Sequence, residues 1–153
     1  MKTLAQDDTT AEILRRLHAL DPASTARWGK MSAPQMVRHL IDSAGVAFGE
    51  VSVSDASGVL QRTVIKWIAL YAPMPWPAEI KTRPEIDQSL GHGSPPGDFK
   101  ADVAELSAMT KRLASQPTGA AWPRHPIFGA MSHAEWLRWA YLHTDHHLRQ
   151  FGA

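Results

Sequence analysis

The segment MSHAEWLRWAYLHTDHHLRQFGA, residues 131–153, carries the strongest helix signals in the chain. Ser132 stands where a helix N-cap belongs, and Glu135 follows three residues later, so the two can form a capping box that satisfies two backbone N–H groups. Gly152 occupies the position of a C′ glycine, which commonly ends a helix in the left-handed conformation. We therefore predict a helix that begins after Ser132 and runs almost to the C-terminus.

The segment GKMSAPQM, residues 29–36, repeats this arrangement earlier in the chain. Ser32 and Gln35 have capping-box spacing, and Pro34 falls in the first turn, where its missing N–H costs nothing. This pattern predicts a second helix from Ser32 to about Phe48. The likeness between the two segments is too short to indicate a duplication.

Two more main helices are predicted from local signals. One is expected to open at Thr9, where Thr9 and Glu12 also have capping-box spacing, and to end at the Asp-Pro pair of residues 21–22. The other is expected after Asp98, a good N-cap residue, with a stop at the sequence QPTG, residues 116–119.

The middle of the chain is irregular. A shorter helix is expected over Val59–Tyr71, and a Pro- and Gly-rich stretch without periodicity follows over Pro73–Gly97. Apolar and polar residues alternate only briefly, at residues 51–53, so no strand is predicted. We expect a single domain over residues 1–153 with an all-α fold, a bundle of four main helices with a long Pro-rich connection between the second and third.

The composition excludes several classes of protein. The net charge is +1 and no long basic block occurs, which argues against a nucleic-acid partner. There is no cysteine, so disulfides, thiolate metal sites and a cysteine nucleophile are excluded. The N-terminus has no apolar signal region, and the most apolar run, residues 67–77, is short and interrupted by prolines. We expect a cytoplasmic protein without a membrane partner.

Three of the eight histidines, His143, His146 and His147, lie close together in the last predicted helix. Residues three or four apart share a helix face, so His143 can pair with either of the other two to bind a transition metal. A catalytic zinc-type site needs a third protein ligand. His39 on the second predicted helix is the candidate, provided that it faces the last helix.

The same histidines have a simpler interpretation. A terminal helix tolerates polar side chains, and a histidine near a helix C-terminus interacts favourably with the helix dipole. Spacing alone leaves the metal site and the polar helix end both open. His125, in the tight HPIFG approach to the last helix, is expected to brace that turn, and no role is expected for His18, His92 or His133.

Several segments together resemble the DinB-like (DinB/YfiT-like) superfamily of metalloenzymes, and most closely an uncharacterised branch of it. The likeness covers nearly the whole chain in order, and its terminal motif is quite specific. It is carried by the Pro-rich middle and by four segments, WGKMSAPQMVRHL (residues 28–40), PPGDF (95–99), HPIFGAMSHAEW (125–136) and HTDHHLRQFG (143–152).

The resemblance implies a four-helix bundle, often dimeric, with a divalent metal, zinc or nickel, on three histidines. Carried over to this sequence, these ligands are His39, His143 and His147, which selects His147 over His146. Several characterised relatives are thiol-dependent transferases or isomerases that use a low-molecular-weight thiol such as bacillithiol, mycothiol or glutathione. A small-molecule substrate and a homodimer are therefore further expectations.

Residues near the proposed ligands have expected roles of their own. Asp42, one turn past His39, is the best-placed carboxylate to orient that ring. Gln150, one turn past His147, is expected to bond a ligand side chain or a metal-bound group. Trp136 and Trp139 are expected in the core. The Pro-rich stretch is either a lid or binding loop, or an ordered strap that packs Trp76 onto the bundle.

The leading hypothesis is a metal-dependent enzyme of the thiol-dependent transferase or hydrolase type. One alternative is a non-catalytic metal-binding protein of the same fold. Another is a stress-associated helical bundle that acts as a dimerisation module. The absence of cysteine is consistent with a thiol that is brought in as a cofactor, and it fits a non-enzyme equally well.

Overall fold

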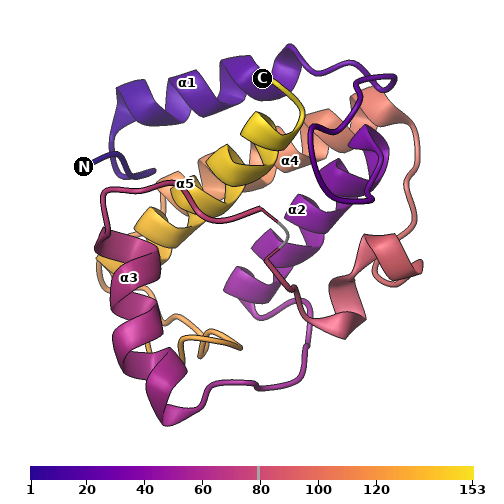
Figure 1. Cartoon of the computed structure of the whole chain (residues 1–153). Coiled ribbons are helices and arrows are strands. Elements are labelled where there is room, and N and C mark those ends of the chain that lie inside the picture. The colour runs from indigo at the N-terminus through magenta and orange to yellow at the C-terminus, as the bar shows by residue number, and fades with distance from the viewer. Residues whose placement is uncertain (79) are drawn as a thin grey trace.

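This computed structural model describes residues 1–78 and 80–153 (Figure 1). In those residues the fold is all-helical, as predicted, and the only β-type pairing is an isolated bridge between His125 and Gly129. The five α-helices are α1 (Asp7–His18), α2 (Ala33–Phe48), α3 (Lys66–Tyr71), α4 (Phe99–Ala114) and α5 (His133–Gln150).

The helices that carry the candidate site begin as predicted. In α2 the Ser32 side chain accepts from the backbone N–H of Gln35, and the Gln35 side chain accepts from the N–H of Ser32. Ser132 and Glu135 form the same capping box at the start of α5. At the other end of α5, Gly152 has a φ of 76°, and the N–H of Ala153 donates to the Leu148 carbonyl, which completes a Schellman motif.

The prediction for the start of α1 was wrong. The helix begins at Asp7 with Gln6 at the N-cap, and Thr9 lies inside its first turn. The preceding residue Leu4 is 2% exposed, and its N–H donates to the Leu137 carbonyl of α5. Burial of Leu4 against the rest of the fold thus favours an earlier start than the local capping pattern indicates, because the gain from apolar burial exceeds that of one cap.

The predicted N-cap of α4 is confirmed, since the Asp98 side chain accepts a hydrogen bond from the N–H of Ala101. The predicted short helix is also present: residues 59–71 are helical throughout, with π-helical geometry at Gln61–Ile65 before α3. Large apolar side chains of this segment remain exposed, among them Val59 (80%) and Trp67 (62%).

Helix α2 packs against α4 and α5, while α1 packs against α4 and α5 from the other side (Figure 1). The core between them consists of apolar side chains at helical spacing, including Ile13, Leu17, Met36, Val37, Leu40, Leu106, Trp136, Leu137 and Leu148. None of the described helices is long and apolar enough to cross a membrane.

The Pro-rich segment (residues 73–97) lies against α2, apart from residue 79, which lies outside the described residues. Two 3-10 turns, Pro84–Ile86 and Gln88–Leu90, contact α2. Asp42 of α2 holds the end of the segment, because its carboxylate accepts hydrogen bonds from the Ser94 N–H at 3.0 Å and from the Ser94 hydroxyl. This arrangement brings backbone groups of the segment next to His39.

Candidate metal centre

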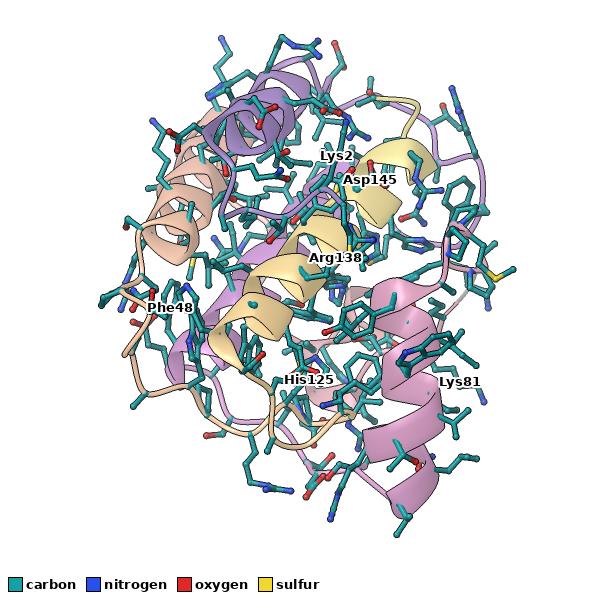
Figure 2. All side chains as sticks on the ribbon, turned by 90° about the vertical axis from the view of Figure 1, so that its left-hand side faces the viewer. Lys2, Phe48, Lys81, His125, Arg138 and Asp145 are labelled. Carbon is teal, nitrogen blue, oxygen red and sulfur yellow. The ribbon has the colours of Figure 1, made fainter. Side chains whose placement is uncertain are left out.

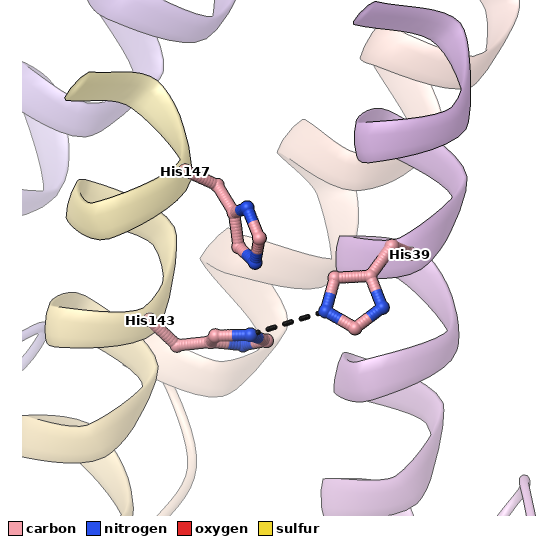
Figure 3. A group of neighbouring side chains, drawn as sticks. All are labelled: His39, His143 and His147. Carbon is pink, nitrogen blue, oxygen red and sulfur yellow. Dashed lines mark hydrogen bonds between the residues drawn. The ribbon is translucent and has the colours of Figure 1, made fainter. Parts of the chain in front are cut away.

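Three histidines from two helices meet in one group (Figure 3). His143 and His147 lie one turn apart on α5, and His39 reaches them from α2. Their candidate ligand nitrogens all lie within 4.8 Å of one another, and Nε2 of His39 is 3.2 Å from Nε2 of His143. The structure therefore joins the three residues that the resemblance selected.

Hydrogen bonds orient two of the three rings. Nδ1 of His39 lies 3.1 Å from the Ile86 carbonyl oxygen, and Nδ1 of His147 lies 2.8 Å from Oε1 of Gln150. Because both partners accept, each Nδ1 carries the proton, and each neutral ring keeps the lone pair of Nε2 free. Gln150 is itself held, since its Nε2–H donates to the Trp28 carbonyl at 2.7 Å.

Burial keeps the three rings neutral. His39 is 2% exposed and His147 is 7% exposed, while His143 is partly buried. Burial lowers the pKa of His39 and holds the pKa values of His143 and His147 well below the ordinary histidine value. The positive charge that each neighbouring histidine would carry lowers the last two pKa values further. Neutral imidazoles are the form that binds a metal.

Aromatic rings and a cavity adjoin the cluster. Trp139 stacks on His143 with ring centroids 5.0 Å apart and planes 24° apart, and the Trp76 ring lies 6.1 Å from His143. A cavity of about 840 Å³ opens beside these rings, and its lining is largely apolar, with Trp76 and Ile86 of the Pro-rich segment and Ile68 of α3 among the residues that border it. Its size is typical of pockets that hold small molecules.

The sequence model of one protein family, described as "Protein of unknown function (DUF1569)", matches residues 2–153. The chain belongs to this family. No curated protein and no solved structure matches it. Membership thus defines the whole chain as a DUF1569 protein, while the chemistry has to be argued from the site itself.

In this DUF1569 protein His146 lies next to the cluster and is not part of it. Its ring centroid is 5.2 Å from that of His147, 5.6 Å from that of Trp28 and 6.0 Å from that of Trp76. Spacing along α5 allows both His146 and His147, but only His147 shares a group of candidate ligand atoms with His39. The packing of α2 against α5 makes this distinction.

The prediction that Asp42 orients His39 was wrong. The Asp42 carboxylate accepts hydrogen bonds from Ser94 and, at 3.4 Å, from Gln88 Nε2, so it anchors the Pro-rich segment. The Ile86 carbonyl of that segment takes the orienting role instead. A backbone carbonyl in an irregular stretch has no sequence signature, and no signal in the chain pointed to it.

Other expected roles are found in the structure. Gln150 contacts His147 as predicted, and Trp136 is buried in the core with 1% exposure. Trp139 is also buried, and in addition it lines the cavity, so it belongs to the core and to the site together. Asp145 lies off the ligand face and pairs with Arg16 at 2.7 Å.

His125 braces the turn before α5, as predicted. Its Nδ1 accepts hydrogen bonds from the N–H groups of Ile127 and Phe128, both at 3.1 Å. Its ring packs against Trp136 and Trp139 with centroids 5.2 and 4.9 Å away. No pattern along the chain indicated that His125 also lines the cavity beside the three histidines.

Proposed function

We propose that His39, His143 and His147 bind one divalent transition metal, zinc or nickel, and that the protein is a metal-dependent enzyme for a small-molecule substrate. The reaction type that we propose is a thiol-dependent transfer or a hydrolysis. The fold is proposed to be a DinB-like four-helix bundle, and the protein is proposed to form a homodimer. The observation that carries the proposal is the convergence of three neutral histidines at the edge of a cavity.

The separation of the donor atoms supports a shared ion. Two nitrogen ligands at about 2.1 Å from a tetrahedral zinc ion lie about 3.4 Å apart. The distance of 3.2 Å between Nε2 of His39 and Nε2 of His143 is close to this value. Without a metal, His143 has to donate an N–H to His39, since the His39 proton resides on Nδ1. A metal ion would take the place of the proton between these two Nε2 atoms.

The residues around the three histidines also fit a bound metal ion. The Ile86 carbonyl and the Gln150 amide orient their histidines through Nδ1, as the outer partners of metal-binding histidines usually do. All three ligands are neutral, so the charge of the ion would not be offset by carboxylate or thiolate ligands. When bound, a divalent ion would supply Lewis acidity, which would favour the deprotonation of a water or thiol reactant near neutral pH.

The side chains around the cavity would bind the substrate and exclude water. The apolar rings of Trp76 and Trp139 border the histidines and limit the access of solvent to His143. The cavity can receive a substrate of moderate size next to the ligand atoms. Because the chain has no cysteine, a thiol reactant has to come from solution.

Metal analysis of the purified protein tests the proposal. We expect about one equivalent of zinc or nickel per chain when chelators are omitted during preparation, and a lower melting temperature after the metal is removed. A preparation without bound metal, whose melting temperature does not change when zinc or nickel is added, would contradict the site. Turnover in a screen of low-molecular-weight thiols with electrophilic substrates would then separate an enzyme from a non-catalytic binder.

A further inference from the structure

Five histidines line the cavity: the three of the cluster, His146 beside them on α5, and His125, which is labelled in Figure 2 and is 3% exposed. His125 comes from the loop before α5, whereas the three clustered histidines come from α2 and α5. Trp139 connects the two groups, because it makes an edge contact with His125 at 4.9 Å and stacks on His143 at 5.0 Å. His125 therefore lines the same cavity wall as the cluster, one aromatic ring away from it.

The proton of the His125 ring has a defined position. Nδ1 accepts two backbone N–H groups, those of Ile127 and Phe128, so it cannot carry a proton. Burial lowers the pKa of His125 to about 3, which keeps the ring neutral near pH 7. The single ring proton of a neutral histidine with an unprotonated Nδ1 is on Nε2. His125 thus presents one N–H donor in one tautomer.

This donor has no acceptor among residues 1–78 and 80–153. The hydrogen bonds of His125 all involve Nδ1 or its backbone, and Nε2 is not one of the fully buried unpaired polar atoms. His125 is one of the residues that line the cavity. A buried N–H without a partner is costly, so a donor of this kind is normally satisfied by water or by a ligand.

We propose that the Nε2–H of His125 is the hydrogen-bond donor that selects the ligand of this cavity, and that the ligand joins a carbonyl-type oxygen to an apolar, ring-sized body. The inference rests on the proposed small-molecule site. The oxygen accepts from His125, and the apolar body contacts Trp139, Ile65 and Ile68, which line the cavity. Because the ring is neutral and held by two backbone groups, the donor is in place before the ligand arrives.

Two substitutions separate this role from the structural brace. In His125→Asn, the side-chain oxygen can accept from the N–H groups two and three residues ahead, as Asn does in Asx turns, but the Nε2–H is lost. In His125→Gln, the longer amide can place an N–H near the former Nε2, while the brace of the turn is lost. Both variants lose the packing of the ring against Trp136 and Trp139, and the second should be the less stable because it also loses the brace of the turn.

Two matched probe molecules test whether an oxygen of the ligand accepts a hydrogen bond from His125. Methyl naphthyl ketone has the carbonyl, and in isopropenylnaphthalene a CH₂ group replaces the carbonyl oxygen without a large change of shape. Binding is measured by the quenching of tryptophan fluorescence, because Trp76 and Trp139 border the cavity. The titrations use the protein as purified and are repeated after chelation, so that contact of the ketone with a metal can be recognised.

The wild-type protein should bind the ketone about fivefold more tightly than the alkene, which corresponds to one net hydrogen bond. His125→Asn should abolish this preference and leave the affinity for the alkene unchanged, and a folded His125→Gln variant should retain it. Equal affinities for both probes in the wild type, or a preference that survives His125→Asn, would overturn the inference. If the purified protein contains no metal but the His125-dependent preference persists, the proposed metal centre fails and the ligand site stands.

Discussion

The Nε2 atom of His39 on α2 lies 3.2 Å from the Nε2 atom of His143 on α5, although 104 positions separate the two residues in the chain. A third ring, His147, completes the group within 4.8 Å (Figure 3). The Nδ1 atoms of His39 and His147 are engaged by the Ile86 carbonyl and by Gln150. The remaining ring nitrogens of His39 and His147, their Nε2 atoms, are therefore the ones available to the group.

Replacement of one ligand should abolish metal binding. His143→Ala leaves two nitrogen donors, fewer than the three protein ligands of a catalytic zinc site, so we expect stoichiometric metal to be lost. Isothermal titration with zinc and metal analysis measure this effect. His146→Ala is the matched control, because His146 is equally part of α5 but outside the ligand group, and it should bind about one equivalent. The reverse result would mean that the pair of ligands on α5 is misassigned and that His146, not His143, binds the metal.

Gln150 should affect metal affinity without touching the metal. Gln150→Leu removes the acceptor of the His147 Nδ1–H, and loss of such an outer partner typically costs about 10–100-fold in affinity. Gln150→Glu restores an acceptor at this place and should recover part of the affinity, although it cannot donate to the Trp28 carbonyl. Competition with a zinc-sensitive dye measures both variants. Equal affinities of Gln150→Leu and the wild type would show that Gln150 does not support the site.

The stability of the protein should fall below pH 6.5. The pKa of His125 is lowered by burial from 6.5 to about 3, so between these values the unfolded chain binds a proton that the folded chain does not. The contribution of the neutral ring is complete above pH 6.5 and decreases as the pH falls toward 3. At pH 5 this residue alone lowers the free energy of unfolding by about 2 kcal/mol relative to pH 7.

Urea denaturation at several pH values measures this dependence. His125→Asn removes the titrating group and should reduce the loss of stability between pH 7 and pH 5 by a similar amount. The buried histidines of the cluster have lowered pKa values too, so a weaker dependence should remain in this variant. An unchanged dependence in His125→Asn would contradict the assignment of a neutral, buried His125.

Two glycines of the Pro-rich segment form a matched pair. Gly91 and Gly93 both have positive φ values, 76° and 82°, so alanine strains the backbone at either position. A Cβ at Gly91 would meet nothing within 4 Å, whereas one at Gly93 would lie 2.5 Å from Oδ2 of Asp42 and 2.7 Å from Nε2 of Gln88. The two substitutions therefore differ mainly in the contact with the anchor of the segment.

Gly91→Ala should lower the free energy of unfolding by about 1 kcal/mol, the usual order of backbone strain. Gly93→Ala should lower it further and should also weaken metal binding, because displacement of the segment moves the Ile86 carbonyl away from His39. Thermal denaturation and zinc titration of both variants measure the difference. Equal metal affinities in the two variants would show that the segment does not support the metal centre.

Helix starts could be predicted wherever the signal is contained within a few residues. The capping boxes of Ser32 with Gln35 and of Ser132 with Glu135 are local, and both were predicted in the right place. The capping pattern at Thr9 is equally local, but burial of Leu4 against α5 moves the start of α1 to Asp7. A local pattern thus predicts a helix end only as long as no tertiary contact favours another start.

The sequence by itself determined the all-helical character, the bounds of α2 and α5, and the presence of histidines at metal-binding spacing, because these depend on neighbours three or four residues apart. The resemblance implied His39, His143 and His147, and the tertiary structure brings these three together. The tertiary structure alone decided that Ile86 rather than Asp42 orients His39, and that His125 borders the same cavity. These relations join residues from separate helices and loops. They arise from the packing of α2 against α5 and of the Pro-rich segment against α2, which no periodicity along the chain encodes.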